Sequence, residues 1–223
     1  IPSFKFQRIE KALLNSPNIT AISDSINQLI DAFEKNYLTA LLEKRNGEYE
    51  KSFRILFSRI KDYPNYYPFY DLLVFSAKAS DNLKEIESFI KANQSPNKYS
   101  DYLSALFFYH TNHYSTAVEL LKNKNDFDPI YLLSYSYRGL GDYDNALITL
   151  NRAESLLQAN SYYLSKVFIS KGSLYLLSGN YAEAEKFYKK RLESAKQFGN
   201  RGEEAKAFIN LGIVDDQNGN VDD

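Results

Sequence analysis

The chain has only two histidines, spaced so that His110 and His113 could share one face of a helix. Zinc sites in proteins use three or four nitrogen, sulfur or oxygen ligands. No further donors are arranged around this pair, the chain contains no cysteine, and His113 falls in an expected turn. We therefore expect no metal site at these histidines.

Oxygen-bearing side chains alternate near the C-terminal end, at Asp216, Asn218, Asn220 and Asp222. Such alternation is typical of calcium loops, which also need a glycine at the sixth position and a final glutamate. Val221 occupies the sixth position and no glutamate follows it. The stretch also coincides with an expected turn between helices, so we expect neither a metal nor a cofactor here.

Catalytic motifs are absent from the sequence. There is no serine-centred elbow, no phosphate-binding loop and no glycine-rich fingerprint. Neighbouring carboxylates such as Glu203 and Glu204 point in different directions on a helix, whereas an acid–base pair needs facing groups in a cleft. Two histidines also leave few general bases near neutral pH. We expect that the protein is not an enzyme.

Composition excludes two further classes of function. The 223 residues include 27 Lys and Arg against 28 Asp and Glu, a net charge of −1, so a large basic surface for nucleic acid is not expected. No run of about 20 apolar residues could span a membrane. The lack of cysteine fits a cytoplasmic protein and equally a periplasmic or cell-envelope one. The chain has no methionine, so a signal peptide could precede Ile1.

Hydrophobic spacing predicts helices along nearly the whole chain. Apolar residues three or four apart predict a helix over 4–14 and one long or two abutting helices over 19–45. The first should end at Ser16-Pro17-Asn18, because proline removes a hydrogen-bond donor. Ile30 belongs to the apolar stripe of the second stretch. No segment alternates apolar and polar residues long enough to predict a strand.

Comparison of the sequence with itself reveals a repeated layout in which a helix is followed by a tight turn and then by an aromatic or aliphatic residue. A small residue lies three positions after that residue, and a large apolar residue lies four positions after the small one. Glycine or asparagine in the turn accepts the left-handed backbone conformation that ends a helix. The small residue allows two helices to approach closely. The windows begin at Gly47, Asn112, Gly141 and Gly179, with a weaker one at Asp81 and a sixth at Gly219.

This layout resembles the tetratricopeptide repeat family, in which helix–turn–helix units of about 34 residues stack into a right-handed superhelix. Residues 131–150 and 172–188 are the best copies, and Pro64 stands where the family closes a unit. In the latter copy Gly172, Tyr175, Gly179, Tyr181, Ala184 and Tyr188 fall at signature positions.

The resemblance implies an all-α solenoid with a helical N-terminal cap over 1–32 and about five and a half repeats over 33–223, the last truncated. Irregular repeat spacing predicts short helices or loops near 93–98 and 123–128, and helices extended by a turn within 148–172 and 188–208. The first helix of the sixth repeat should expose its apolar face, so we expect the chain to continue beyond Asp223 or a partner to cap it.

The family further implies that the first helix of each repeat lines an inner groove. The family positions that face this groove correspond here to Tyr37, Leu41, Lys44, Arg45, Asp71, Phe75, Lys78, Tyr99, Tyr102, Leu106, Tyr109, Tyr131, Tyr135, Arg138, Lys166, Ile169, Ser173 and Leu177. Chaperone-binding members clamp a C-terminal carboxylate with asparagine and lysine. Tyr135 and Ser173 stand where asparagine would be needed, so we do not expect that function.

An aromatic groove of this kind suits an amphipathic helix or extended segment of a partner protein. The sequence thus predicts a bacterial scaffold or adaptor module of a larger protein that binds protein segments. Residues 1–15, or a segment beyond 223, could instead fill the groove. Two other functions stay open: an N-terminal regulatory or sensory domain of a larger protein, and an exported protein acting in envelope assembly or cell division.

Overall fold

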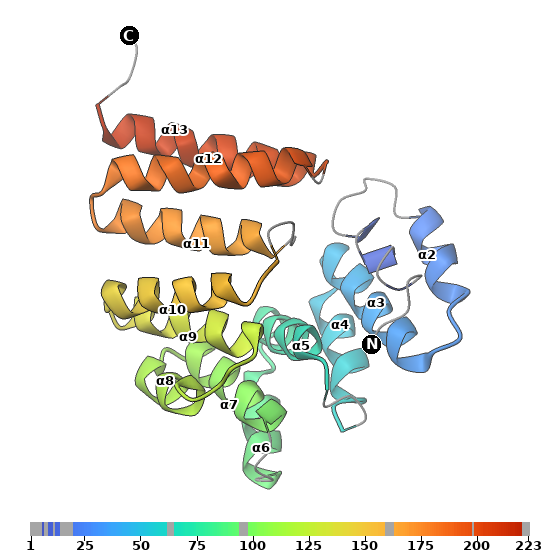
Figure 1. Cartoon of the computed structure of the whole chain (residues 1–223). Coiled ribbons are helices and arrows are strands. Elements are labelled where there is room, and N and C mark those ends of the chain that lie inside the picture. The colour runs from blue at the N-terminus through green and yellow to red at the C-terminus, as the bar shows by residue number, and fades with distance from the viewer. Residues whose placement is uncertain are drawn as a thin grey trace. The chain divides into compact units, whose positions relative to one another are not determined.

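The computed structural model is entirely helical in the residues that it describes, which are 6, 9–10, 12–13, 20–61, 65–93, 98–158, 163–197 and 199–219. The chain divides into two units, residues 1–120 and 121–223 (Figure 1). Of the helix predicted over 4–14, only 6, 9–10 and 12–13 are described, and those residues are helical. Pro64 and residues 220–223 lie outside the described part.

In the first unit α3 packs against α4, α4 against α5, and α5 against α7. The stretch predicted over 19–45 forms two helices, with the Asp31 side chain capping the second by accepting a hydrogen bond from the Glu34 N–H at 2.9 Å. Ile30 lies between them and is fully exposed, so its assignment to the buried stripe was wrong. The helices are α2 (Thr20–Asn27), α3 (Ala32–Arg45), α4 (Tyr49–Phe57), α5 (Tyr67–Ala79), α6 (Leu83–Ala92), α7 (Lys98–His110) and α8 (Tyr114–Leu121).

The second unit stacks α9 on α10, α11 on α12 and α12 on α13 (Figure 1). Its helices are α9 (Phe127–Gly139), α10 (Tyr143–Ser155), α11 (Leu164–Leu177), α12 (Tyr181–Gln197) and α13 (Arg201–Gln217). The extension predicted within 188–208 is confirmed, since α12 and α13 have 17 residues each. The extension predicted within 148–172 was wrong, because the additional residues there lie between α10 and α11.

The predicted turns all contain a residue in the left-handed backbone conformation. Four are glycines at φ between 71° and 83°, and Asp81 and Asn112 adopt φ of 61° and 64°. A further left-handed turn, at Gly199, was not predicted. After the turn residue, a backbone N–H returns to the carbonyl five residues earlier, as from Asn180 to Tyr175 at 2.8 Å. This hydrogen bond ends a helix and reverses the chain. It explains why even the weak window at Asp81 forms a hairpin.

Small residues lie where the paired helices approach most closely. Ser52, Ala117, Ala146 and Ala184 are all fully buried. At Gly172 a Cβ atom would lie 2.5 Å from the Cε1 atom of Tyr188 on the paired helix. The ring of Tyr188 therefore packs directly against the backbone of α11, and a larger residue at 172 would overpack this contact.

Two buried cations join neighbouring helices in the second unit. Lys171 of α11 pairs with Glu154 of α10, and Arg191 of α12 donates to Glu203 of α13 at 2.7 Å. The Nε and Nη1 atoms of Arg191 make no hydrogen bond to any described residue. Burial opposes ionisation of Glu203, yet the hydrogen bonds from Arg191 and Lys206 lower its pKa. These pairs fix how successive helices stack.

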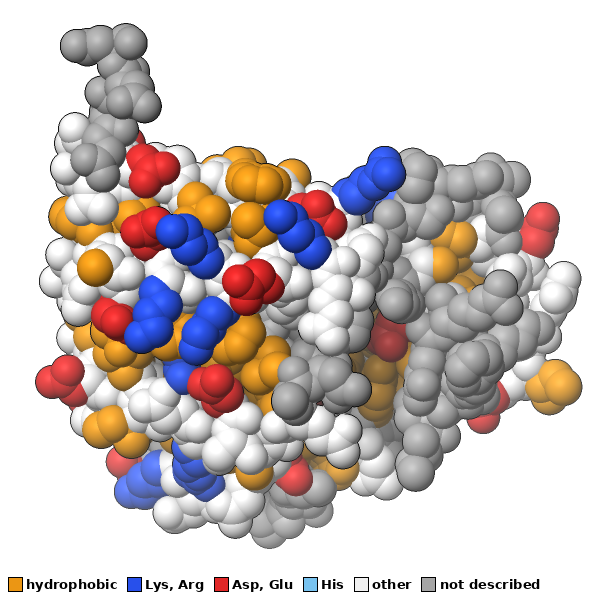
Figure 2. All heavy atoms as spheres, turned by 45° about the horizontal axis from the view of Figure 1, so that its top comes forward, with side chains coloured by type: hydrophobic (Ala, Val, Ile, Leu, Met, Phe, Trp, Pro, Cys, Tyr) orange, Lys and Arg blue, Asp and Glu red, His pale blue; other side chains and the backbone are white. Residues whose placement is uncertain are grey.

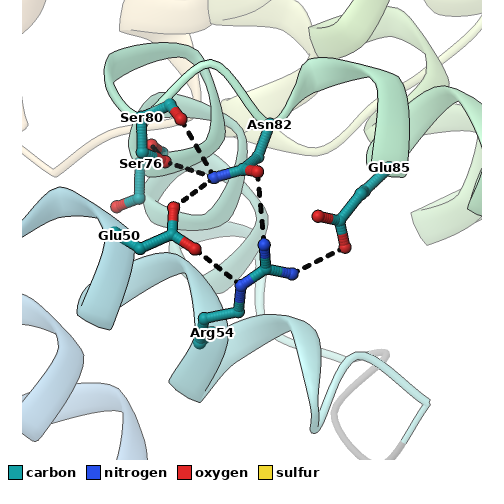
Figure 3. Close-up of polar contacts among 6 residues, drawn as sticks. All are labelled: Glu50, Arg54, Ser76, Ser80, Asn82 and Glu85. Atoms are coloured by element: carbon teal, nitrogen blue, oxygen red, sulfur yellow. Dashed lines mark hydrogen bonds and ion pairs between the residues drawn. The ribbon is translucent and has the colours of Figure 1, made fainter.

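An exposed polar network joins neighbouring helices in the first unit (Figure 3). Arg54 of α4 donates to Glu50 and to Glu85, both at 2.7 Å, and to Asn82 at 3.3 Å. The Asn82 amide in turn donates to Glu50 and to Ser80. The network connects α4 to the start of α6. None of the described helices combines the length and hydropathy needed to cross a bilayer.

Candidate functional site

Four aromatic rings form a cluster at the start of the first repeat, which we call the first inner face. Phe33 and Tyr37 of α3 lie beside Tyr66, which directly precedes α5, with centroid distances of 5.3 Å from each to Tyr66. Phe6 supplies the fourth ring, 5.7 Å from Tyr37 and 6.0 Å from Tyr66. Phe6 is completely buried.

Polar contacts hold the N-terminal residues on the same face. The Tyr66 hydroxyl donates to Glu10 at 3.2 Å, and the Arg45 guanidinium donates to the carbonyl of Leu13 at 2.8 Å. Burial, followed by the charge of Glu10, raises the pKa of Tyr37 well above its usual range. At this end of the predicted groove, therefore, the chain's own N-terminal residues lie against Tyr37 and Arg45.

The middle of the first unit places its predicted groove residues in two groups. In the first group Lys44 lies 4.3 Å above the ring of Phe75, which is 40% exposed. Lys78 in this group is exposed, and Leu41 is half-buried. Tyr102, by contrast, is only 3% exposed, and its hydroxyl donates to Asp71 at 2.6 Å. Tyr102 is thus held within the first unit.

Tyr99, another predicted groove residue, packs with Tyr102 through Tyr67. The ring of Tyr67 lies 4.9 Å from that of Tyr99 and 4.7 Å from that of Tyr102. Further along, half-buried Tyr109 lies 5.1 Å from the ring of His110. Burial, together with the charge of Lys78, lowers the pKa of His110 to about 4. His113 instead hydrogen-bonds Thr111 at 3.1 Å. Within the described residues no cluster of metal-ligating side chains forms.

Three hydroxyl groups meet in the second unit, on a surface that we call the second inner face. Tyr131 and Tyr135 of α9 lie 2.9 Å apart at their hydroxyls, and both reach Ser170 of α11, at 2.9 and 3.0 Å. Ser170 and Tyr131 also contact the carbonyl of Lys166. Burial raises the pKa of Tyr131 well above its usual range.

Arg138 lies at the far end of the second inner face. Its guanidinium stacks on the ring of Tyr135 at 4.4 Å. No carboxylate of the described residues pairs with Arg138. The guanidinium borders a shallow depression, without room for a water molecule, lined by Ser134, Tyr135, Arg138, Leu150, Ser170 and Leu174. This arrangement places a cation beside hydroxyl and aliphatic groups.

Aromatic rings lie at the near end of the second inner face. Phe127 stacks on Tyr131 at 5.5 Å and lies 5.3 Å from Tyr163, which is 38% exposed. Lys166 lies 5.1 Å from the centre of the Tyr163 ring. Burial raises the pKa of Asp128, while Lys166 opposes that rise. The face therefore carries rings at one end and Arg138 at the other.

Two predicted groove residues of α11, Ile169 and Ser173, pack toward α12. Ile169 contacts the buried cluster of Ala184, Tyr188 and Val214. Ser173 lies 3.3 Å from the Tyr188 hydroxyl. Both are half-buried, so they border the second inner face and also support the α11–α12 contact.

Sequence reasoning missed Ser170, Phe127, Tyr163, Phe33 and Tyr66 as parts of these faces. It named residues 1–15 as a segment that could fill the groove, without singling out Phe6. Ser170 follows the groove position Ile169 by one residue, and Phe127 lies one turn before Tyr131, so helical spacing could have indicated both. Tyr163 and Phe6 reach the faces from outside the first helices. Only tertiary structure brings them there.

The apolar face of α13 is exposed, as expected for a first helix without a second one beside it. Phe208, Ile209 and Ile213 all lie on it and are 43–63% exposed. Figure 2, in which the α12–α13 end of Figure 1 comes forward, shows hydrophobic side chains among Lys, Arg, Asp and Glu. This face differs from the inner faces in having no cluster of hydroxyl groups among its described residues.

Comparison with known proteins identifies the repeats. Family models for the tetratricopeptide repeat match residues 127–158 and 168–202. No curated protein matches the sequence. The matched segments contain α9–α10 and most of α11–α12, the two hairpins whose sequences carry the clearest signature.

One solved structure shows the same fold at low identity. A chain in the crystal structure of the APC/C hetero-tetramer Cut9–Hcn1 is 12% identical with a TM-score of 0.61, over 94% of this chain and 45% of that chain. The present chain thus spans less than half of that relative. A chain in the structure of Naa15/Naa10 bound to HypK is 15% identical with a TM-score of 0.38, over 93% and 36% of the two chains. A structure of MamA (MSR-1) is 17% identical with a TM-score of 0.38, over 86% of this chain and 93% of that chain. With their hairpins and left-handed turns, residues 127–158 and 168–202 are two tetratricopeptide repeats.

Proposed function

We propose that this protein is a non-catalytic scaffold that binds a helical or extended segment of a partner protein on its inner faces. Tetratricopeptide repeats support a role in protein–protein interaction. The observation that carries the finer proposal is the second inner face, where the hydroxyls of Tyr131 and Tyr135 meet, and where Tyr135, Ser170 and the stacked Arg138 border one depression.

The side chains of this face suit recognition of a protein segment. Tyrosine offers a large rigid surface at low cost in conformational entropy and keeps a hydroxyl for hydrogen bonding. Arginine stacked on an aromatic ring holds its N–H groups ready for a carboxylate or carbonyl. Together Tyr135 and Arg138 combine apolar area with directional hydrogen bonding, which is typical of interface hot spots.

The first inner face supports the same proposal from within the chain. There Phe6, Glu10 and Leu13 already contact Tyr37, Tyr66 and Arg45. A segment with an aromatic anchor thus fits an inner face of this protein. We propose that partner binding concerns the second inner face, while the chain's own N-terminal residues cover this part of the first.

Affinity capture from native extract tests the proposal. Wild-type protein is compared with the double variant Tyr135→Ala/Arg138→Gln and with Ile148→Ala, a change at an exposed residue of α10. We expect at least one protein to be recovered about 10-fold less with the double variant and equally with Ile148→Ala. An unchanged set of recovered proteins for a folded double variant would contradict the proposal.

A further inference from the structure

The two inner faces place the same kinds of side chain at matching positions. Phe33 is the second residue of α3 and Phe127 the first of α9, and Tyr37 and Tyr131 each follow four residues later. Tyr66 and Tyr163 each directly precede the first helix of the next repeat, as its N-cap. The rings meet at the same distance, because Phe33–Tyr66 and Phe127–Tyr163 are both separated by 5.3 Å.

The two sets of rings differ in exposure. In the first set Phe6 packs on the rings, and Tyr37 is 5% exposed. Phe33 and Tyr66 of the first set are half-buried, as are Phe127 and Tyr131 of the second, in which Tyr163 is 38% exposed. The two sets therefore differ in exposure between Tyr37 and Tyr131 and between Tyr66 and Tyr163. Apolar ring surface that remains in water gains free energy when another aromatic ring covers it.

A cation follows at the other end of each face. Arg45 lies eight residues after Tyr37, and Arg138 lies seven residues after Tyr131. In a helix these separations correspond to about 10–12 Å along the axis. Phe6 and Leu13 are also seven residues apart, so the N-terminal residues run parallel to α3 and bring a carbonyl to Arg45.

Charge favours an acidic group between these two anchors. Glu10 accepts a hydrogen bond from Tyr66 in the first face. At the second face Lys166 lies beside Tyr163, the counterpart of Tyr66, and Arg138 adds a second positive charge. A glutamate placed like Glu10 would meet a tyrosine hydroxyl and a lysine there, which gives charge complementarity.

We propose that the second inner face binds a helical partner segment with an aromatic residue, a glutamate four residues later and a main-chain carbonyl at the seventh, the arrangement of Phe6, Glu10 and Leu13. The segment runs parallel to α9, its ring covers Phe127, Tyr131 and Tyr163, and its carbonyl accepts from Arg138. This inference rests on the proposed function and specifies the partner's chemistry.

A peptide with the sequence of residues 1–15 provides the probe, because it carries the required spacing. Its binding to the full chain is measured by fluorescence anisotropy, with a Phe6→Ala peptide as the matched control. Protein variants are Tyr163→Ala, Arg138→Gln and, as an exposed aromatic outside the face, Phe208→Ala. The peptide change leaves the protein unaltered, so its effect cannot come from misfolding.

We expect saturable binding below about 1 mM peptide. Affinity should fall about 10-fold for the Phe6→Ala peptide and for Tyr163→Ala, several-fold for Arg138→Gln, and not at all for Phe208→Ala. Absence of saturable binding, or equal affinity for both peptides or for wild type and Tyr163→Ala, would overturn the inference. If affinity capture succeeds while the peptide fails, the proposed function stands and the partner's chemistry is different.

Discussion

In the first inner face the chain supplies both the receptor and the segment that covers it, whereas in the second inner face Tyr131 and Tyr163 are more exposed than their counterparts Tyr37 and Tyr66. Phe6 is fully buried on Tyr37 in the first, while Tyr163 remains 38% exposed in the second. Arg45 donates to the carbonyl of Leu13, but Arg138 stacks on its own neighbour, Tyr135.

This difference shows that a groove position does not by itself mark a binding residue. The same side chain stabilises the fold where a neighbouring segment covers it and remains accessible where none does. Substitutions in the first inner face should therefore lower the free energy of unfolding, whereas equivalent ones in the second should mainly affect binding. Four experiments test this contrast, from the largest expected effect to the smallest.

Phe6→Ala should cost about 3–5 kcal/mol of unfolding free energy, because it empties the centre of a buried ring cluster. Phe127→Ala, at a half-buried ring, should cost about 1 kcal/mol. Urea denaturation of both variants measures the difference. Equal losses would remove the contrast between the two faces.

Gly172→Ala and Gly212→Ala compare a glycine packed against a neighbouring helix with a glycine that has open space beside it. Its Cβ would lie 2.5 Å from Tyr188, whereas at Gly212 of α13 no atom lies within 4 Å. We expect Gly172→Ala to destabilise by about 1–3 kcal/mol through overpacking. Gly212→Ala should be neutral or stabilise by up to about 1 kcal/mol through helix propensity. Thermal unfolding distinguishes these signs, and a loss at Gly212 like that at Gly172 would show that α13 is covered.

Arg45→Gln and Arg138→Gln compare the two cations. Loss of the Arg45 hydrogen bond to Leu13 should cost about 1 kcal/mol. Arg138→Gln loses only the stacking on Tyr135, which we expect to cost about 0.5 kcal/mol. Chemical denaturation provides the measurement. A greater loss at Arg138 would indicate that its main role is structural.

Acid should change the stability of the protein in opposite directions through His110 in the first unit and Asp128 in the second. The pKa of His110 is about 4 in the folded protein against an ordinary 6.5, so the unfolded chain binds the proton first and stability falls as pH drops through this range. The pKa of Asp128 is raised above 3.8, so stability instead rises on acidification toward its folded value.

Variants separate these two contributions, each expected to be no more than about 1 kcal/mol because solvent screens partly exposed groups. His110→Gln should flatten the loss between pH 6.5 and 4. Asp128→Asn should stabilise at neutral pH, with a gain that shrinks at lower pH. Urea midpoints measured across this range test both signs, and a parallel pH profile for wild type and His110→Gln would refute the first.

Local chemistry explains which features could be predicted from the sequence. A residue such as Gly179 ends its helix through its own backbone preference, and Ala184 is small because a neighbouring helix passes close by, so repeat spacing predicted both. The exposure of Ile30 and the loop before α11 escaped prediction, because apolar periodicity does not say where a helix is interrupted.

The candidate site was only partly predictable for a different reason. Tyr131, Tyr135 and Arg138 share one face of a helix, and their spacing indicated this. The positions of Phe6 on Tyr37 and of Ser170 beside Tyr135 depend on contacts between residues about 30 or more apart in the sequence. No local pattern records such contacts, so the covered and exposed faces looked alike.

Site-specific photo-cross-linking tests the central claim most directly. A benzophenone amino acid is placed at Tyr135 on the second inner face or at Ile148 on α10, and cross-linked peptides from native extract are identified by mass spectrometry. The account predicts one recurrent partner segment at position 135, absent at position 148 and lost with Arg138→Gln. The same cross-linked proteins at both positions would contradict it.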